Sequence, residues 1–158
     1  MGLGDRLFEP PAADADKVEA RLVRLAPQLR HLIQRAGDAL AINDMQRAQQ
    51  ALSSALAMAP GQPDALRLYG LLLAQSGNHD AALANFEAAL RAAPDDAVTS
   101  WQYARACEDA GKLDAAFDLR RHAIERLPQS PLAWEDLGEH LFAHMEAKAA
   151  IAPLERAV

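Results

Sequence analysis

Two histidines are the residues whose types and spacing come nearest to a chemical site. His140 and His144 lie four residues apart in the segment HLFAH, with Glu139 and Glu146 nearby. On a helix this spacing places both imidazoles on one face, where a pair can chelate zinc. The segment lacks the internal glutamate of the HExxH motif, and no third ligand is clearly placed. We therefore predict a solvated helix face, no metal site and no cofactor.

The remaining residues give no sign of catalysis. The single cysteine, Cys107, cannot form an intramolecular disulfide and has no activating motif, which favours a buried, inert thiol. The sequence contains no Gly-rich phosphate loop, no GxSxG and no DxDxDG. We expect no catalytic residues and no enzyme activity within these 158 residues.

The overall charge and hydropathy restrict the partners. A formal net charge of −6 disfavours nucleic acid, because an acidic surface repels phosphate. No stretch approaches the roughly 20 apolar residues that a membrane span needs. The N-terminal residues lack the charged-then-apolar pattern of a signal peptide. We expect a cytoplasmic protein with no membrane partner.

The elements that position these residues are predicted to be helices. The chain is 51% hydrophobic but only 5% aromatic. Ala, Leu, Arg and Glu, which are frequent here, lose little entropy in a helix. Val, Ile, Thr and Tyr are too scarce for a sheet of any size. The composition therefore predicts an all-α fold.

Prolines mark an internal period. Pro27, Pro60, Pro94 and Pro128 recur at intervals of 33, 34 and 34 residues, each expected to close an apolar helical segment. The clearest unit runs over residues 63–96. Its pattern residues are Leu66, Tyr69, Gly70, Leu73, Gly77, Ala82, Phe86, Ala89 and Pro94. The small residues are expected to let two helices approach closely, and the larger ones to fill the space between them.

Neighbouring units repeat this pattern, and two of them depart from it. In the unit of residues 97–130, Ser100 and Arg120 stand where bulky apolar residues are expected. The unit of residues 30–62 is one residue short between its helices when it is aligned on Gly37 and Pro60. Gly77 and Gly111 lie where the first helix must stop, which predicts a left-handed C-cap at both.

This pattern resembles the tetratricopeptide repeat (TPR) over about residues 14–158. The resemblance implies a right-handed superhelical solenoid of antiparallel helix pairs. The expected organisation is a flexible tail (1–13), a degenerate half-repeat that ends at Pro27 (14–29), three repeats (30–62, 63–96 and 97–130) and a truncated fourth (131–158).

The resemblance also implies where a partner binds. In this family the first helix of each repeat lines a concave groove that holds peptides or partner segments. The corresponding residues are Gln34, Arg35, Asp38, Arg67, Leu71, Trp101, Gln102, Arg105, Glu108, Glu135, Glu139 and Phe142. We expect a protein or peptide ligand at these positions.

Two features of the groove leave alternatives open. Trp101 is either an exposed recognition residue, of the kind that dominates interface hot spots, or shielded by a neighbouring helix. The second feature is a charge polarity, with a basic strip of Arg35, Arg67 and Arg105 and an acidic C-terminal half that contains Glu108, Asp109, Glu135, Asp136 and Glu139. These charges are either ordinary solvated charge or the mark of a ligand with an acidic and a basic end.

The predicted function is a protein–protein interaction scaffold. One alternative is the N-terminal module of a larger bacterial enzyme, of the sulfotransferase, glycosyltransferase or aspartyl/asparaginyl hydroxylase type. This alternative is suggested by the last unit, which stops within its second helix, so that no polar helix caps the end of the solenoid. The other alternative is self-association through this uncapped C-terminal helix.

Overall fold

The computed structural model describes residues 12–144, 156 and 157. In this part of the chain there are eight α-helices and no strand, which confirms the predicted all-α class. The helices are α1 (Ala12–Val23), α2 (Pro27–Ala41), α3 (Met45–Met58), α4 (Pro63–Gln75), α5 (His79–Ala92), α6 (Ala97–Asp109), α7 (Leu113–Arg126) and α8 (Pro131–His144). The chain divides into two compact units, residues 16–94 and residues 95–158 with the N-terminal residues up to Ala15.

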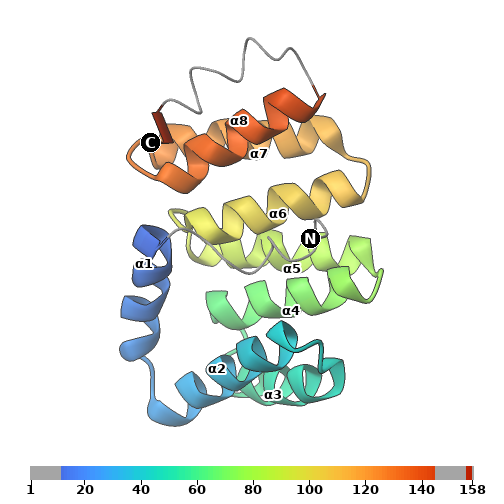
Figure 1. Ribbon diagram of the computed structural model, residues 1–158. Coiled ribbons are helices and arrows are strands. Elements are labelled where there is room, and N and C mark those ends of the chain that lie inside the picture. Colours follow the sequence, from blue (N-terminus) through green and yellow to red (C-terminus); the bar gives the residue numbers. More distant parts are fainter. Residues whose placement is uncertain (1–11, 145–155, 158) are drawn as a thin grey trace. The chain divides into compact units, whose positions relative to one another are not determined.

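Within each unit, consecutive helices form pairs. In residues 16–94, α2 packs against α3 and α4 against α5, and α6 packs against α7 in the other unit (Figure 1). The connecting turns are short, so the two helices of a pair run in opposite directions. Polar side chains begin several of these helices: the carboxylate of Asp44 accepts from Arg47 N at 3.0 Å, and that of Asp96 from Val98 N at 3.0 Å.

The turns inside the three pairs adopt the same conformation. Gly77 and Gly111 have φ angles of 77° and 73°, as predicted, and Asn43 has a φ of 59°. Asn43 precedes Gly77 by the same 34 residues that separate the two glycines. Asparagine tolerates this left-handed region better than most L-residues. The prediction that the first pair is one residue short is therefore wrong, because Asn43 replaces glycine in a turn of equal length.

The helices α4 and α5 approach each other closely at Gly70. A Cβ atom added to Gly70 would lie 3.1 Å from Cε1 of Phe86 and 3.2 Å from its two Cδ atoms. Phe86 is completely buried. At the equivalent positions of the first pair, Ala36 and Leu52 are also completely buried. The small residue in the first helix thus makes room for a large one in the second.

Pro27 begins a helix, and the prediction that it closes one is wrong. It is the first residue of α2, where proline is favoured because its missing N–H would have no intrahelical partner. The preceding helix, α1, ends earlier, at Val23, and begins at Ala12, inside the expected tail of residues 1–13. The rest of that tail, residues 1–11, lies outside the described residues.

Pro60, Pro94 and Pro128 do follow helix ends, as predicted. They come two residues after the last residue of α3, α5 and α7 respectively. Proline is common at this place because it cannot continue a helix.

In the unit that contains residues 95–158, α8 packs against both α6 and α7. The Ser130 hydroxyl, at the start of α8, donates to the carboxylate of Asp14 at 3.0 Å, and both side chains are buried. Trp134 donates from Nε1 to the Pro128 carbonyl at 2.8 Å, with the Arg156 guanidinium 5.0 Å from its ring centre. Most of the predicted second helix of the last repeat, residues 145–155, lies outside the described residues.

Candidate functional site

The predicted groove residues lie on the first helices of the pairs, α2, α4, α6 and α8. In the unit of residues 16–94, a cleft of about 450 Å³ opens on α2 and α4, and α1 contributes to its wall. Its lining consists of Glu19, Leu22, Ile33, Gln34, Gly37, Asp38, Arg67 and Leu68. The cleft therefore brings together three of the predicted residues, Gln34, Asp38 and Arg67.

Two lining residues were missed because of the error in register. With turns of equal length, Ile33 and Gly37 occupy the positions that Arg67 and Leu71 hold in α4. Of the other predicted residues in this unit, Leu71 is buried and does not line the cleft, and Arg35 is exposed outside it.

The cleft has an apolar floor and an acidic rim. Leu22, Ile33 and Leu68 are 7%, 2% and 6% exposed, whereas Glu19 and Asp38 are exposed. The cation at this site, Arg67, is buried within 3.9 Å of the Asp64 carboxylate. Asp64 also pairs with Arg21, so it does not fully offset the charge of Arg67. The exposed charged residues of the lining are Glu19 and Asp38, so the accessible charge at the rim is negative.

An ion pair holds α1 against α4 in this unit. Arg21 donates from Nε to Asp64 Oδ2 at 2.8 Å and from Nη2 to Oδ1 at 2.5 Å. The amide of Gln62 also donates to Asp64, at 3.0 Å. Burial alone would raise the pKa of Asp64, but these hydrogen bonds and the charge of Arg21 hold it below its ordinary value. The bidentate pair fixes the segment that carries Leu22 over the cleft.

Trp101 is 6% exposed, so the structure supports the shielded alternative. Gln102 is also buried, whereas Glu135 and Phe142 are exposed, Phe142 by 68%. Trp101 is therefore not the exposed residue that the hot-spot alternative requires, and we no longer expect it to act as one.

The predicted residues of α6 and α8 meet through charge pairs. Arg105 lies 3.6 Å from the Glu139 carboxylate, so the expected separation of basic and acidic groups does not hold here. Arg120, on α7, is 1% exposed and reaches carboxylates on both first helices, Glu108 at 3.1 Å and Asp136 at 3.0 Å. Burial raises the pKa of Asp136 to about 7, and the charge of Arg120 offsets this only in part.

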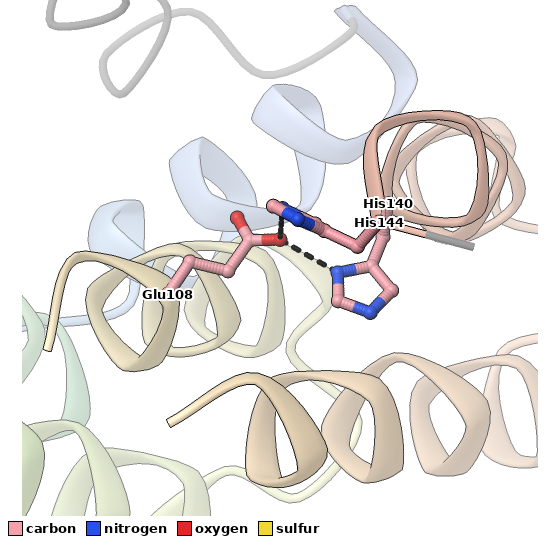
Figure 2. Close-up of side chains that lie close together, drawn as sticks. All are labelled: Glu108, His140 and His144. Carbon is pink, nitrogen blue, oxygen red and sulfur yellow. Dashed lines mark hydrogen bonds and ion pairs between the residues drawn. The ribbon is translucent and has the colours of Figure 1, made fainter. Parts of the chain in front are cut away.

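Glu108 also contacts the two histidines of α8, as Figure 2 shows. Its Oε1 atom lies 2.6 Å from Nδ1 of His140 and 3.3 Å from Nε2 of His144. The three side chains each offer one atom of a metal-binding type, and these atoms all lie within 4.8 Å of one another. His140 is 2% exposed, so the prediction of a solvated helix face is wrong for this histidine, although His144 is exposed.

The surroundings favour the ionised carboxylate and the neutral imidazole. Burial alone would raise the pKa of Glu108, but the hydrogen bond with His140 and the charge of Arg120 lower it overall. Burial lowers the pKa of His140, and its hydrogen bond with Glu108 opposes this only in part. Nearby, Cys107 is buried as predicted, and burial raises the pKa of its thiol.

One signal in the sequence pointed to this cluster. Arg120 stands at the position that Phe86 holds in the second pair, where the repeat pattern requires a bulky apolar residue. A buried arginine needs anionic partners, and Glu108 and Asp136 supply them. The departure at Ser100 carries no such contact among the described residues, where Ser100 is simply buried.

Repeated antiparallel helix pairs of this kind define an α-helical repeat protein of the solenoid class. Two models of the tetratricopeptide repeat match the sequence, over residues 38–100 and 98–141. The chain therefore belongs to the tetratricopeptide-repeat family, whose repeats generally serve as protein-interaction scaffolds and are not themselves catalytic. No curated protein matches the sequence.

Solved structures share the fold at low sequence identity. An O-GlcNAc transferase variant of Thermobaculum terrenum is 24% identical, with a TM-score of 0.71 over 82% of this chain and 26% of its own. Pseudomonas aeruginosa PilF is 19% identical, with a TM-score of 0.73 over 82% of this chain and 60% of its own. MamA is 15% identical, with a TM-score of 0.67 over 82% of this chain and 75% of its own.

The chain thus spans about a quarter of the length of that transferase. None of the helices in the described part of the chain is long and apolar enough to cross a membrane.

Proposed function

We propose that this protein is an interaction module that binds a peptide segment of a partner protein in the cleft on α2 and α4. The observation that carries the proposal is the cleft itself, which lies on the first helices of two repeats and has an apolar floor. The segment we propose has one apolar side chain for this floor, flanked by Lys or Arg.

The charge of the rim selects the basic flank. Glu19 and Asp38 are exposed at the cleft, whereas Arg67, the basic residue of the lining, is buried. A segment with Asp or Glu beside its apolar residue would meet like charge, which costs binding energy and slows association. The sequence suggested a ligand whose acidic end binds the arginines of the first repeats. We now propose a basic flank at this place instead.

Selection from a random peptide library, with the purified protein as bait, tests the proposal. We expect the selected peptides to share an apolar residue next to Lys or Arg. Fluorescence anisotropy then measures their affinity for the double variant Glu19→Lys/Asp38→Lys, which should bind at least about tenfold more weakly, because two rim charges change sign.

The matched control is Glu87→Lys, which makes the same type of charge reversal at an exposed position of α5 outside the cleft. It should bind like the wild type. Peptides without a basic residue, or equal binding by the double variant, would refute the cleft as the partner site.

A larger enzyme that carries this module remains a second proposal. The fold shared with an O-GlcNAc transferase chain, of which this chain spans 26%, favours it. The size of the native protein, measured with an antibody against these repeats, decides: a native mass near 17.1 kDa would exclude it. The proposed self-association through the C-terminal helix involves residues 145–155, outside the described part, and light scattering of the purified chain tests it.

A further inference from the structure

The cluster of Glu108, His140 and His144 has the composition of a metal site. Two imidazoles and one carboxylate are a ligand set that zinc uses when a fourth position stays open. His140 and His144 are one helical turn apart on α8, and Glu108 approaches them from α6 (Figure 2). The third ligand, missing from the histidine pair in the sequence, is thus supplied by another helix.

We propose that this cluster binds one Zn²⁺ ion through Nδ1 of His140, Nε2 of His144 and Oε1 of Glu108. The site lies within the unit that contains residues 95–158 and is independent of the cleft, which belongs to residues 16–94. Either proposal can therefore fail without the other.

Two of the three separations between the ligand atoms come close to those around a bound ion; the two imidazole nitrogens lie within 4.8 Å of each other and must approach by up to about 1.4 Å. With zinc–ligand bonds of about 2.0–2.1 Å, neighbouring ligand atoms of a tetrahedron lie about 3.3–3.4 Å apart. His144 Nε2 and Glu108 Oε1 already lie 3.3 Å apart. His140 Nδ1 lies 2.6 Å from the same oxygen, and this separation must widen by about 0.7 Å. The two atoms then bind the ion instead of sharing a hydrogen bond.

The surrounding side chains hold two of the ligands in place. Arg120 donates to Oε2 of Glu108 at 3.1 Å, which leaves Oε1 directed at the histidines. The ring of Phe117 stacks on that of His140, with 5.9 Å between the centroids. Partners of this kind orient metal ligands, and their loss typically reduces metal affinity about 10–100-fold.

The nearby charges also suit a cation. Arg120 is shared between the carboxylates of Glu108 and Asp136, so these three groups together carry at most one net negative charge. His144 is exposed, so the fourth position can hold water or a side chain from a partner. A bound ion would link α6 to α8.

The direct test is a calorimetric titration of tag-free, chelator-treated protein with ZnCl₂. We expect saturable binding of one ion per chain. His144→Ala, at an exposed position that should not disturb folding, and Glu108→Gln should each weaken binding at least about tenfold. The matched control is His122→Ala, an exposed histidine of α7 outside the cluster, which should bind zinc like the wild type.

Substitution by Co²⁺ gives a second readout. The wild type should show the intense visible absorption of a four-coordinate site, and His144→Ala should lose it. The absence of saturable zinc binding in the wild type would overturn the proposal, as would equal affinity of the wild type and His144→Ala. In either case the cluster is a hydrogen-bonded Glu–His pair without a metal.

Discussion

Replacement of Gly70 by alanine tests the close approach of α4 and α5. The added methyl group would lie 3.1 Å from Cε1 of Phe86 and 3.2 Å from both Cδ atoms. Phe86 is completely buried, so its ring cannot move into solvent without leaving the core. Either the ring or the α4 backbone must move by a few tenths of an ångström.

Two effects of opposite sign set the magnitude. Alanine in place of glycine within a helix stabilises by about 1 kcal/mol, whereas overpacking of a filled core costs about 1–3 kcal/mol. Gly37, inside α2, has no atom within 4 Å of its added Cβ and isolates the first effect. We therefore expect Gly37→Ala to stabilise the protein, and Gly70→Ala to be less stable than Gly37→Ala by about 1–3 kcal/mol.

Urea denaturation followed by far-UV circular dichroism measures both free energies of unfolding. The first pair of helices suggests a rescue, because Ala36 faces the second helix where Leu52 replaces Phe86. Gly70→Ala/Phe86→Leu should therefore recover much of the loss that Gly70→Ala shows. If Gly70→Ala stabilises the protein as much as Gly37→Ala does, the proposed contact between Gly70 and Phe86 is refuted.

Three further substitutions probe buried groups. Trp101→Ala should lower the free energy of unfolding in urea by about 3–5 kcal/mol, as loss of a buried aromatic does; an unchanged value would restore Trp101 as an exposed recognition residue. Arg21→Ala should cost about 1.5–3 kcal/mol at neutral pH by removing hydrogen bonds to a charged group. Because the pKa of folded Asp64 lies below its ordinary value of 3.8, this stabilisation should be fully present above that pH and disappear below it, as unfolding at several pH values would show. Arg120→Leu should destabilise by about 3–5 kcal/mol. Arg120→Leu/Asp136→Leu should be as stable as the wild type or more so, because it removes the pair's two deeply buried charges and leaves Glu108 its hydrogen bond with His140. Thermal denaturation distinguishes the single variant from the double variant. An equal loss of stability in both would contradict the idea that the buried pair of Arg120 and Asp136 has a net cost.

The repeat could be predicted from the sequence because local packing dictates it. Gly70 and Phe86 must differ in size for their helices to approach, and Gly77 must reverse the chain at a positive φ. These requirements act within about twenty residues and recur with each unit. They therefore leave a periodic pattern that a single sequence displays.

The placement of α1 could not be predicted in this way. Its position depends on Arg21 meeting Asp64 on another helix, a contact for which the repeat has no standard place. Pro27 added to the error, because proline is favoured both after one helix and at the first position of the next. The burial of Trp101 likewise depends on tertiary packing, which helix periodicity does not describe.

The candidate metal site could be predicted from the sequence only in part. Its histidine pair was visible from spacing alone, but Glu108 is 32 positions away, and only the packing of α6 against α8 brings it close. Arg120 was the available clue, because a cation in the position of Phe86 must be compensated by carboxylates within reach of a buried side chain. Asp136, the partner of Arg120 on α8, lies one helical turn before His140. The contact between Arg120 and Asp136 therefore also brings His140 close to Arg120 and Glu108. The departure from the repeat pattern at Arg120 thus marks a place where neighbouring residues meet a requirement besides the scaffold, whereas the departure at Ser100, which is also buried, marks no such place among the described residues.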